Sequence, residues 1–247
     1  MLAIIGGSGL NQLANLVGSR REVVRTPYGE PSGPLTFGTI NGKSVVFIAR
    51  HGYGHTIPPH SVNYRANIWA LAKAEVSQIV SIASVGGIRA DLVPGTLIVP
   101  HQIVDYTWGR DSTFHDGLDG HVVHIDFTEP YDAQLRQRLL VAASKLGEQV
   151  VDHAVYAATQ GPRLETAAEI NRLERDGADI VGMTGMPEAV LAREMQLPYA
   201  AIMVVANHAA GRGDNITSIQ FKNIEGVLKQ SMVRVHRVIE QICLDIN

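Results

Sequence analysis

Five apolar segments of this chain each end in a short cluster of polar residues or glycines, and this feature constrains the fold more than any other. Each segment has the length and the β-branched content of a buried strand, and helical apolar spacing fills much of the sequence between them. In folds that alternate strands with helices, ligands bind at the carboxyl ends of the strands. We therefore expect an α/β fold whose functional site brings together the clusters at residues 6–9, 50–51, 84–87, 183–184 and 207–208.

The same patterns predict the individual elements. Strands are expected over residues 2–5, 44–49, 78–84, 150–158, 179–181 and 198–206, with a β-rich stretch over 96–106. Helices are expected over residues 62–74, 132–146, 165–175, 187–195 and 221–244, the second of them capped by Asp132. No repeat or linker divides the 247 residues, and this length fits one large domain. We expect a single domain, residues 1–247, in which helices flank a central mixed sheet.

Composition and charge exclude several classes of protein. With 45% hydrophobic and 18% charged residues, the chain is expected to be an ordered globular protein. A net charge of −3 argues against a general nucleic-acid binder, and no apolar run approaches the length of a membrane span. The N-terminus lacks the basic region of a signal peptide, and the single Cys243 has no partner for an internal disulfide. We expect a cytoplasmic protein that binds neither nucleic acid nor membrane.

Two of the clusters are candidate anion sites. The turn Gly6-Gly7-Ser8-Gly9 offers backbone N–H groups and a hydroxyl, and Arg50 beside His51 offers charge-assisted hydrogen bonds. Taken alone, the first is more simply a tight turn after a strand, and the second a loop arginine paired with a carboxylate.

Other chemistries find less support. The glycine turn lacks the Lys-Ser/Thr of a P-loop, and Gln12 replaces the third glycine of a dinucleotide fingerprint, which disfavours a nicotinamide-dependent oxidoreductase. His51, His55 and His60 have no zinc-motif spacing, so we expect no metal. One group of carboxylates fits a solvated loop, although its spacing leaves paired-carboxylate glycosidase chemistry open: Asp111, Asp116, Asp119, Asp126 and Glu129.

Longer motifs carry a specific resemblance. The string HTIPPHSVNYRANIWAL at 55–71 joins IIGGSGL at 4–10, ASVGG at 83–87, VPGT at 93–96, QGPRLETAAE at 160–169, GMTGMPEAVLARE at 182–194 and VVANHAAG at 204–211. Together they resemble the trimeric purine nucleoside phosphorylase family, and its methylthioadenosine phosphorylase branch most. The resemblance implies a partly barrel-like sheet and a homotrimer without cofactor or metal. It also implies an enzyme that splits an N-glycosidic bond with inorganic phosphate, giving a free purine and a sugar 1-phosphate.

The resemblance assigns residues to this chemistry at the strand ends. Met183 is expected against the ribose and purine, and Val85 departs from the small residue usual in its turn. The remaining positions are expected around the phosphate: Ser8, Arg50, His51, the Ala83 backbone, Ser84 and Thr184.

Two positions predict a 6-oxopurine as the base. The methylthioadenosine branch has two aspartates separated by one residue where this chain has Asn207-His208-Ala209, and a small hydroxyl residue where this chain has Glu165. An ionised glutamate accepts from N1–H, while an asparagine donates to O6 and accepts from N7–H as the purine leaves. A site built for these bonds rejects adenine. We expect Glu165 and Asn207 to be catalytic, with His208 and Ala209 beside the substrate.

The residue expected beside the 5′ position of the sugar predicts an apolar substituent there. Inosine and guanosine phosphorylases usually carry a histidine for the 5′-hydroxyl where this chain has Ile219, which suits a methylthio group. Loop residues around His124 are expected to close this side from a neighbouring subunit. We expect phosphorolysis of S-methyl-5′-thioinosine. Inosine/guanosine phosphorylase, methylthioadenosine phosphorylase and a catalytically silent purine-binding module are the alternatives.

Overall fold

Strand β5 (Gln78–Gly87) organises the sheet because it pairs with three other strands. It pairs in parallel with β1 (Leu2–Gly6) on one edge and with β11 (Tyr199–His208) on the other. Its last residues pair antiparallel with β10 (Ile180–Gly182). Strand β1 also pairs in parallel with β4 (Lys43–Ala49). The carboxyl ends of β4, β1, β5 and β11 therefore meet at one edge, as the polar clusters predicted.

A ring of strands closes beside β5. Strand β6 (Leu97–Ile98) pairs in parallel with β8 (Val150–Val151). Strand β7 (Gln102–Asp105) pairs in parallel with β9 (Val155–Ala158). Two backbone bonds span the interruptions, from Val99 N to Val151 O at 2.9 Å and from His101 N to Ala154 O at 3.1 Å. Because β6 also pairs with β11, and β9 with β10, the pairing returns to β5. The α/β fold with a mixed, partly barrel-like sheet is confirmed.

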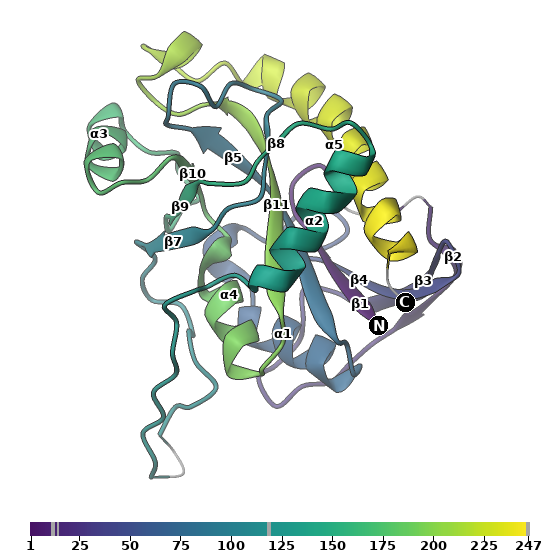
Figure 1. Cartoon of the computed structure of the whole chain (residues 1–247). Helices are drawn as coiled ribbons and strands as arrows, with labels where there is room; N and C mark the ends of the chain where they lie inside the picture. The colour runs from purple at the N-terminus through teal and green to yellow at the C-terminus, as the bar shows by residue number, and fades with distance from the viewer. Residues whose placement is uncertain (11–12, 14, 118–119, 246–247) are drawn as a thin grey trace.

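Helices cover both faces of the sheet (Figure 1). Helices α1 (Tyr64–Lys73) and α4 (Gly185–Glu194) contact each other on one face, and α2 (Ala133–Lys145) and α5 (Phe221–Leu244) do so on the other. Successive residues of a strand point to opposite faces. Accordingly, Ala3 and Ile5 of β1 join the core beneath α1 and α4, whereas Leu2 and Ile4 join the core beneath α2 and α5.

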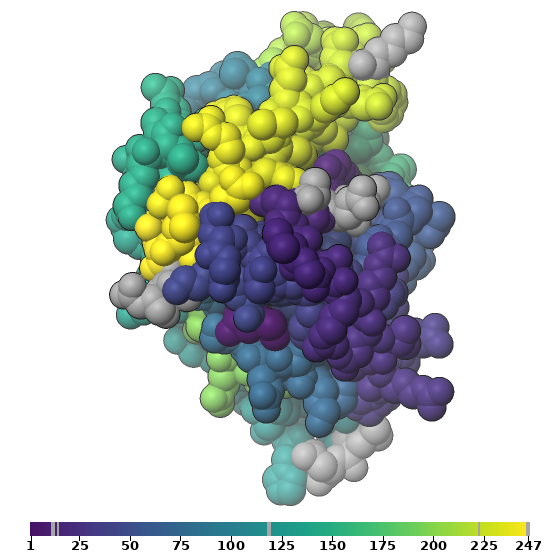
Figure 2. Space-filling model, turned by 90° about the vertical axis from the view of Figure 1, so that its right-hand side faces the viewer, coloured from purple at the N-terminus to yellow at the C-terminus, as the bar shows by residue number. Residues whose placement is uncertain are grey.

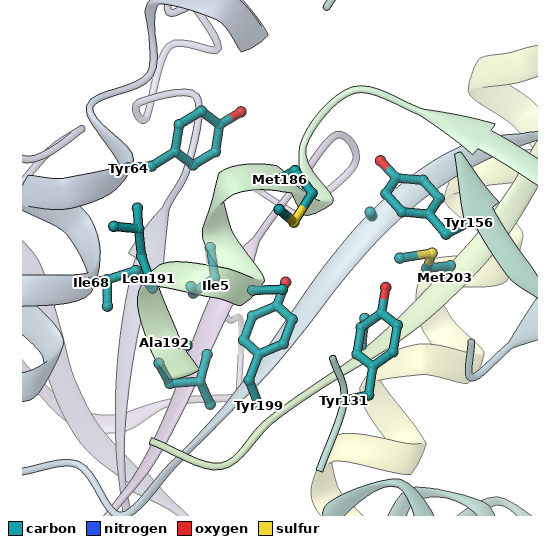
Figure 3. Packing of buried hydrophobic residues seen from close by; sticks show 14 of the residues in the cluster. Ile5, Tyr64, Ile68, Tyr131, Tyr156, Met186, Leu191, Ala192, Tyr199 and Met203 are labelled. Carbon is teal, nitrogen blue, oxygen red and sulfur yellow. The ribbon is translucent and has the colours of Figure 1, made fainter. Parts of the chain in front are cut away.

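The first of these cores is rich in aromatic side chains. Figure 3 shows Tyr131, Tyr156 and Tyr199 beside Met186, with Leu191 of α4 facing Ile68 of α1. The rings of Tyr131 and Tyr199 stack with centroids 6.0 Å apart. This core also includes Ala83 and Val85 from the last part of β5, so it supports that strand end.

A smaller apolar cluster supports helix α3 (Ala167–Arg175). Ile170 and Leu173 pack against residues of β9 and β10, and Thr166 with Glu169 forms a capping box at the start of the helix. Helix α3 therefore begins two residues later than residue 165, where the sequence predicted its start, because Thr166 takes the capping position.

Two strands at the N-terminal side were not predicted. Strand β2 (Val17–Glu22) is exposed along its whole length, so it lacks the apolar alternation of a half-buried strand. It pairs only with β3 (Leu35–Ile40), which pairs in turn with β4. Figure 2 shows the N-terminal residues on the surface next to helix α5, and Asn41 donates to the Glu240 carbonyl there.

The single strand predicted over 150–158 is two strands, since residues 152–154 interrupt it. Helix α4 spans Gly185–Glu194, but Met186 and Pro187 have non-helical backbone angles, so its regular part begins next to the predicted start at Pro187. The computed structural model describes residues 1–10, 13, 15–117 and 120–245, so Gln12 and Asp119 lie outside the described residues. Within these ranges, no helix combines the length and the apolar composition that crossing a bilayer requires.

The predicted cap of helix α2 provides a test of local stability. Asp132 accepts a hydrogen bond from Leu135 N at 2.7 Å. We expect Asp132→Ala to lower the free energy of unfolding by about 1 kcal/mol, because it leaves an N-terminal amide of the helix unpaired. Urea denaturation measures the change, with the exposed Glu30→Ala as control. Equal stability of the two variants would contradict the capping role.

Candidate active site

One cavity of about 510 Å³ lies at the carboxyl ends of the strands. Glycine turns, strand ends and the start of helix α4 all contribute to its walls. Ten of the twelve residues predicted from the sequence line it: Ser8, Arg50, His51, Ala83, Ser84, Glu165, Met183, Thr184, Asn207 and Ile219. The structure thus brings together groups that are up to 211 residues apart in the sequence (219 − 8).

The other two predicted residues lie outside the cavity lining. Ala209 is buried in the apolar cluster beneath helix α3, and its amide donates to the Gly87 carbonyl at 2.8 Å. The imidazole of His208 packs against Gly213, where an added Cβ would lie 2.3 Å from Nδ1. Ala210, which the sequence did not single out, lines the cavity instead.

Arg50 forms a buried ion pair with Glu188 of helix α4. Its Nε and Nη2 donate to the two carboxylate oxygens at 2.6 and 2.8 Å, and both side chains are 1% exposed. Ser81 and Tyr199 also donate to Glu188, at 2.6 and 2.8 Å. Burial by itself would lower the pKa of Arg50, but the Glu188 carboxylate outweighs it and raises the pKa above its ordinary value.

The remaining donors of Arg50 face the middle of strand β5. Nη2 donates to Ser81 Oγ at 2.6 Å and Nη1 to the Ile82 carbonyl at 3.1 Å. A guanidinium has five N–H groups, so one on Nη1 has no acceptor within the described part of the chain. Gly7 packs onto this end, since an added Cβ would lie 2.4 Å from the Ile82 oxygen and 2.9 Å from Nη1. The glycine turn is therefore needed to let the chain approach Arg50.

His51 is held as a neutral imidazole. Its Nδ1 lies 2.8 Å from the Ile57 carbonyl oxygen, which only accepts, so Nδ1 carries the proton and Nε2 carries a lone pair. Burial and, next, the positive charge of Arg50 lower the pKa of His51 to about 4. At neutral pH the cavity therefore contains an imidazole acceptor next to a guanidinium whose charge Glu188 balances.

A buried tyrosine organises the start of helix α4. The Tyr156 hydroxyl accepts hydrogen bonds from the backbone amides of Thr184 and Gly185 at 3.1 and 3.3 Å. The Thr184 side chain makes no capping bond to the helix. Thr184 itself lines the cavity.

The two residues predicted to contact the purine are each held by one short hydrogen bond. Thr159 Oγ1 donates to Glu165 Oε1 at 2.6 Å, and Asn207 Nδ2 donates to the His208 carbonyl at 2.6 Å. Each side chain keeps further polar capacity: the second carboxylate oxygen of Glu165, and the carbonyl oxygen and one N–H of Asn207. Both groups can therefore bind a ligand without losing the bonds that orient them.

Apolar side chains also line the cavity. Ile219 lies there with Phe221 and Ile224 from the first turn of helix α5. Buried Asn215 fixes the preceding loop, because it donates to the His208 carbonyl at 2.5 Å and accepts from Gln220 N at 3.0 Å. The apolar residues of the cavity are thus held in place by a hydrogen-bonded loop and by the first turn of helix α5.

Comparison with known proteins establishes the family. The sequence matches the phosphorylase superfamily over residues 1–243. It is 51% identical to a probable S-methyl-5′-thioinosine phosphorylase of Pseudomonas syringae pv. tomato, covering 97% of each chain. The chain belongs to the phosphorylase superfamily. It is also 45% identical to the 6-oxopurine nucleoside phosphorylase of Pyrococcus furiosus, over 85% of this chain and 80% of that one.

A solved structure supports the same conclusion for the fold. Methylthioadenosine phosphorylase from Schistosoma mansoni in complex with adenine matches with a TM-score of 0.91 at 33% identity, over 98% of this chain and 90% of that chain. The family expected from the motifs is therefore confirmed, and this chain is a purine nucleoside phosphorylase-type enzyme.

Several residues of the phosphorylase cavity were not predicted. The lining includes His55, Thr56, Ile57, Pro58 and Pro59, whose motif contributed only to the family resemblance. Its place in the chain, directly after Arg50-His51, is the signal that could have marked it. By contrast, no local pattern marks Glu188, whose partner Arg50 is 138 residues away.

A metal site at the cavity histidines has no support among the residues that the structure describes. Among the residues that the structure describes, no group of three or more His, Cys, Asp or Glu side chains is placed to hold a metal ion. The rings of His51 and His55 lie 4.8 Å apart and tilted, as neighbours in a loop. The three-histidine alternative therefore has no geometric support in the described chain.

The buried ion pair predicts a large and specific loss of stability. We expect Glu188→Gln to reduce the free energy of unfolding of the phosphorylase by about 3–5 kcal/mol, because Arg50 would keep its charge in a buried site without a counter-ion. The control is Glu22→Gln, which removes the exposed pair with Arg20 and should cost less than about 1 kcal/mol. Chemical denaturation measures both, and similar losses would refute the role of the buried pair.

His51 predicts a pH dependence of stability. The unfolded chain protonates this histidine near its ordinary pKa of about 6.5, whereas the folded chain does so only near 4. Its contribution to stability is therefore complete above pH 6.5 and is lost as the pH falls towards 4. We expect the drop in unfolding free energy between pH 7 and pH 5 to be smaller in His51→Gln than in the wild type. The prediction is wrong if the two proteins lose the same amount.

Proposed function

We propose that this phosphorylase cleaves S-methyl-5′-thioinosine with inorganic phosphate, giving hypoxanthine and 5-methylthioribose 1-phosphate. The observation that carries the proposal is the combination, in one cavity, of Glu165 and Asn207 with the apolar wall of Ile219, Phe221 and Ile224. The first pair suits a 6-oxopurine, and the apolar wall suits a thioether.

Phosphate binds, in this proposal, among the hydroxyls of Ser8, Ser84 and Thr184 and beside Arg50 and His51. The free Nη1–H of Arg50 donates to one phosphate oxygen. Neutral His51 accepts through Nε2, so it favours an oxygen that carries a proton, as one oxygen of the phosphate dianion and two of the monoanion do. Charge-assisted hydrogen bonds within the cavity then hold the phosphate. The protein therefore needs no basic surface, in agreement with its net charge of −3.

The base is recognised by complementary hydrogen bonds. The Glu165 carboxylate, oriented by Thr159, accepts from N1–H of hypoxanthine. Asn207 donates its free N–H to O6, and its carbonyl oxygen accepts from N7–H as that proton arrives. Adenine presents a lone pair at N1 and would face the Glu165 carboxylate with no proton between them.

The reaction follows from these positions. The bond from the ribose C1′ to N9 lengthens, its electron pair moves to the purine, and N7 takes up a proton from solvent, to which the phosphate releases its own proton as it becomes an ester. Phosphate on the opposite face stabilises the positive charge that develops on the ribose, and one of its oxygens then bonds to C1′. The proposal needs no covalent enzyme intermediate, no metal and no cofactor, since phosphate is the second substrate.

The relatives named above support this substrate. Those named as probable S-methyl-5′-thioinosine phosphorylases include the 51% identical protein of Pseudomonas syringae pv. tomato. We extend the proposal to a cytoplasmic homotrimer acting as one catalytic domain over residues 1–247, the assembly that the family resemblance implies.

Inosine or guanosine is the second candidate substrate. The 45% identical relative from Pyrococcus furiosus is named a 6-oxopurine nucleoside phosphorylase, and His55 adds a polar group to the cavity lining. Either substrate would satisfy Glu165 and Asn207, so the 5′ group decides between them.

The test is the release of free base from three nucleosides, with and without phosphate. We expect the highest kcat/KM for S-methyl-5′-thioinosine, a lower value for inosine, the lowest for S-methyl-5′-thioadenosine, and no release without phosphate. Ile219→His should move the preference towards inosine by about tenfold or more, because it places a hydrogen-bonding group beside the 5′ position.

Ile219→Val is the matched control, because it shortens the side chain but keeps the wall apolar. A wild-type protein that prefers inosine or S-methyl-5′-thioadenosine overturns the proposed substrate. An unchanged preference in Ile219→His would show that another residue reads the 5′ group.

A further inference from the structure

Arg110 has a hydrogen-bond acceptor for every N–H of its guanidinium. Nε donates to the side chain of Gln160 at 3.1 Å, and Nη2 donates to the carbonyls of Thr159 and Gln160 at 3.2 and 2.8 Å. Nη1 has three acceptors within 3.2 Å: the carbonyls of Met183 and Met186 and the Tyr64 hydroxyl. One side chain therefore ties together three segments that are distant in the sequence.

Each of these segments continues into a different wall of the cavity. Thr159 holds Glu165, the carboxylate proposed to read the base. Met183 lines the cavity itself and precedes Thr184 of the proposed phosphate site. Tyr64 donates to the Pro59 carbonyl at 2.9 Å, and Pro59 lines the third wall. Arg110 does not line the cavity, so its effect on a ligand passes through these neighbours.

The partners of Arg110 distinguish it from the other arginines near the site. Arg50 is neutralised by Glu188, whereas Arg110 has no carboxylate at ion-pair distance among the described residues. It contacts carbonyls, an amide oxygen and the face of the Tyr64 ring, 5.4 Å from the centroid. A planar fork of five donors can bind so many acceptors at fixed angles, but a lysine has three donors on one atom and cannot. The fixed angles of these hydrogen bonds therefore explain why an arginine occupies position 110.

We propose that Arg110 is a positioning residue that fixes the base-reading wall of the cavity relative to the wall of Met183 and Thr184 and the wall of Pro59. In the reaction, these walls hold the two substrates in line, and a displacement of about 1 Å costs on the order of 10²-fold in rate. The part of the proposal that concerns base selectivity rests on the proposed function of Glu165. The part that concerns rate holds for any purine nucleoside that the enzyme cleaves.

The test compares Arg110→Lys with Arg136→Lys. Arg136 is a matched control because it also donates to backbone carbonyls, those of Val99, Pro100 and Asp152, and it lies outside the cavity lining. We expect Arg110→Lys to lower kcat by about 100-fold and to reduce the preference for a 6-oxopurine over a 6-aminopurine nucleoside by about tenfold. Arg136→Lys should change neither, even if it lowers the melting temperature as much.

A second variant covers the case in which Arg110→Lys does not fold. Tyr64→Phe removes only the hydroxyl that links Arg110 to Pro59, and it keeps the ring and its packing. We expect a smaller loss of kcat, about tenfold, with little change in the melting temperature. If Arg110→Lys is unfolded, the kcat of Tyr64→Phe alone decides whether Arg110 has the positioning role. A loss of about tenfold supports that role, and an unchanged kcat overturns it.

The outcomes separate the two proposals. Unchanged kcat and unchanged selectivity in a folded Arg110→Lys, or the same losses in Arg136→Lys, overturn the positioning role. A wild-type enzyme that prefers another nucleoside overturns the proposed substrate only, and kcat is then measured with that nucleoside. A loss of kcat without a loss of base selectivity overturns the link from Arg110 to Glu165.

Discussion

The ion pair between Arg50 and Glu188 is the interaction on which the architecture of the site depends. Two charges that are 99% buried are tolerated because they neutralise each other, and Ser81 and Tyr199 complete the hydrogen bonds of the carboxylate. The pair joins the end of β4 to β5, β11 and helix α4. Because these elements converge on one group, the strand ends cannot shift independently of the helix that begins at Gly185.

This arrangement changes how anion binding at the site should be understood. The sequence predicted charge-assisted hydrogen bonds from Arg50 and His51, but Glu188 balances the charge of Arg50 and burial keeps His51 neutral. The cavity therefore offers directed hydrogen bonds more than net charge, which agrees with a slightly acidic chain. Directed donors and acceptors also favour one orientation of a phosphate, which suits an in-line displacement better than a diffuse positive field does.

The sequence predicted the parts of the fold and site that leave a local signal. Apolar runs ending in polar clusters marked β1, β4, β5, β10 and β11, and ten of the twelve chosen residues line one cavity. Strand β2 was missed because a fully exposed strand shows no alternation, and the break at 152–154 was missed because the ring bends there. Glu188 and Arg110 were missed for another reason: their partners lie far away in the chain, so only the folded structure shows what they hold.

The central claim is that one cavity holds a phosphate and a 6-oxopurine at opposite sides of the ribose position. A crystal structure of the protein with phosphate and hypoxanthine tests it most directly. The account predicts phosphate oxygens within hydrogen-bond distance of Arg50 Nη1 and His51 Nε2, and N1 of hypoxanthine within hydrogen-bond distance of the Glu165 carboxylate. A base bound away from Glu165 and Asn207, or a phosphate that contacts neither Arg50 nor His51, would contradict it.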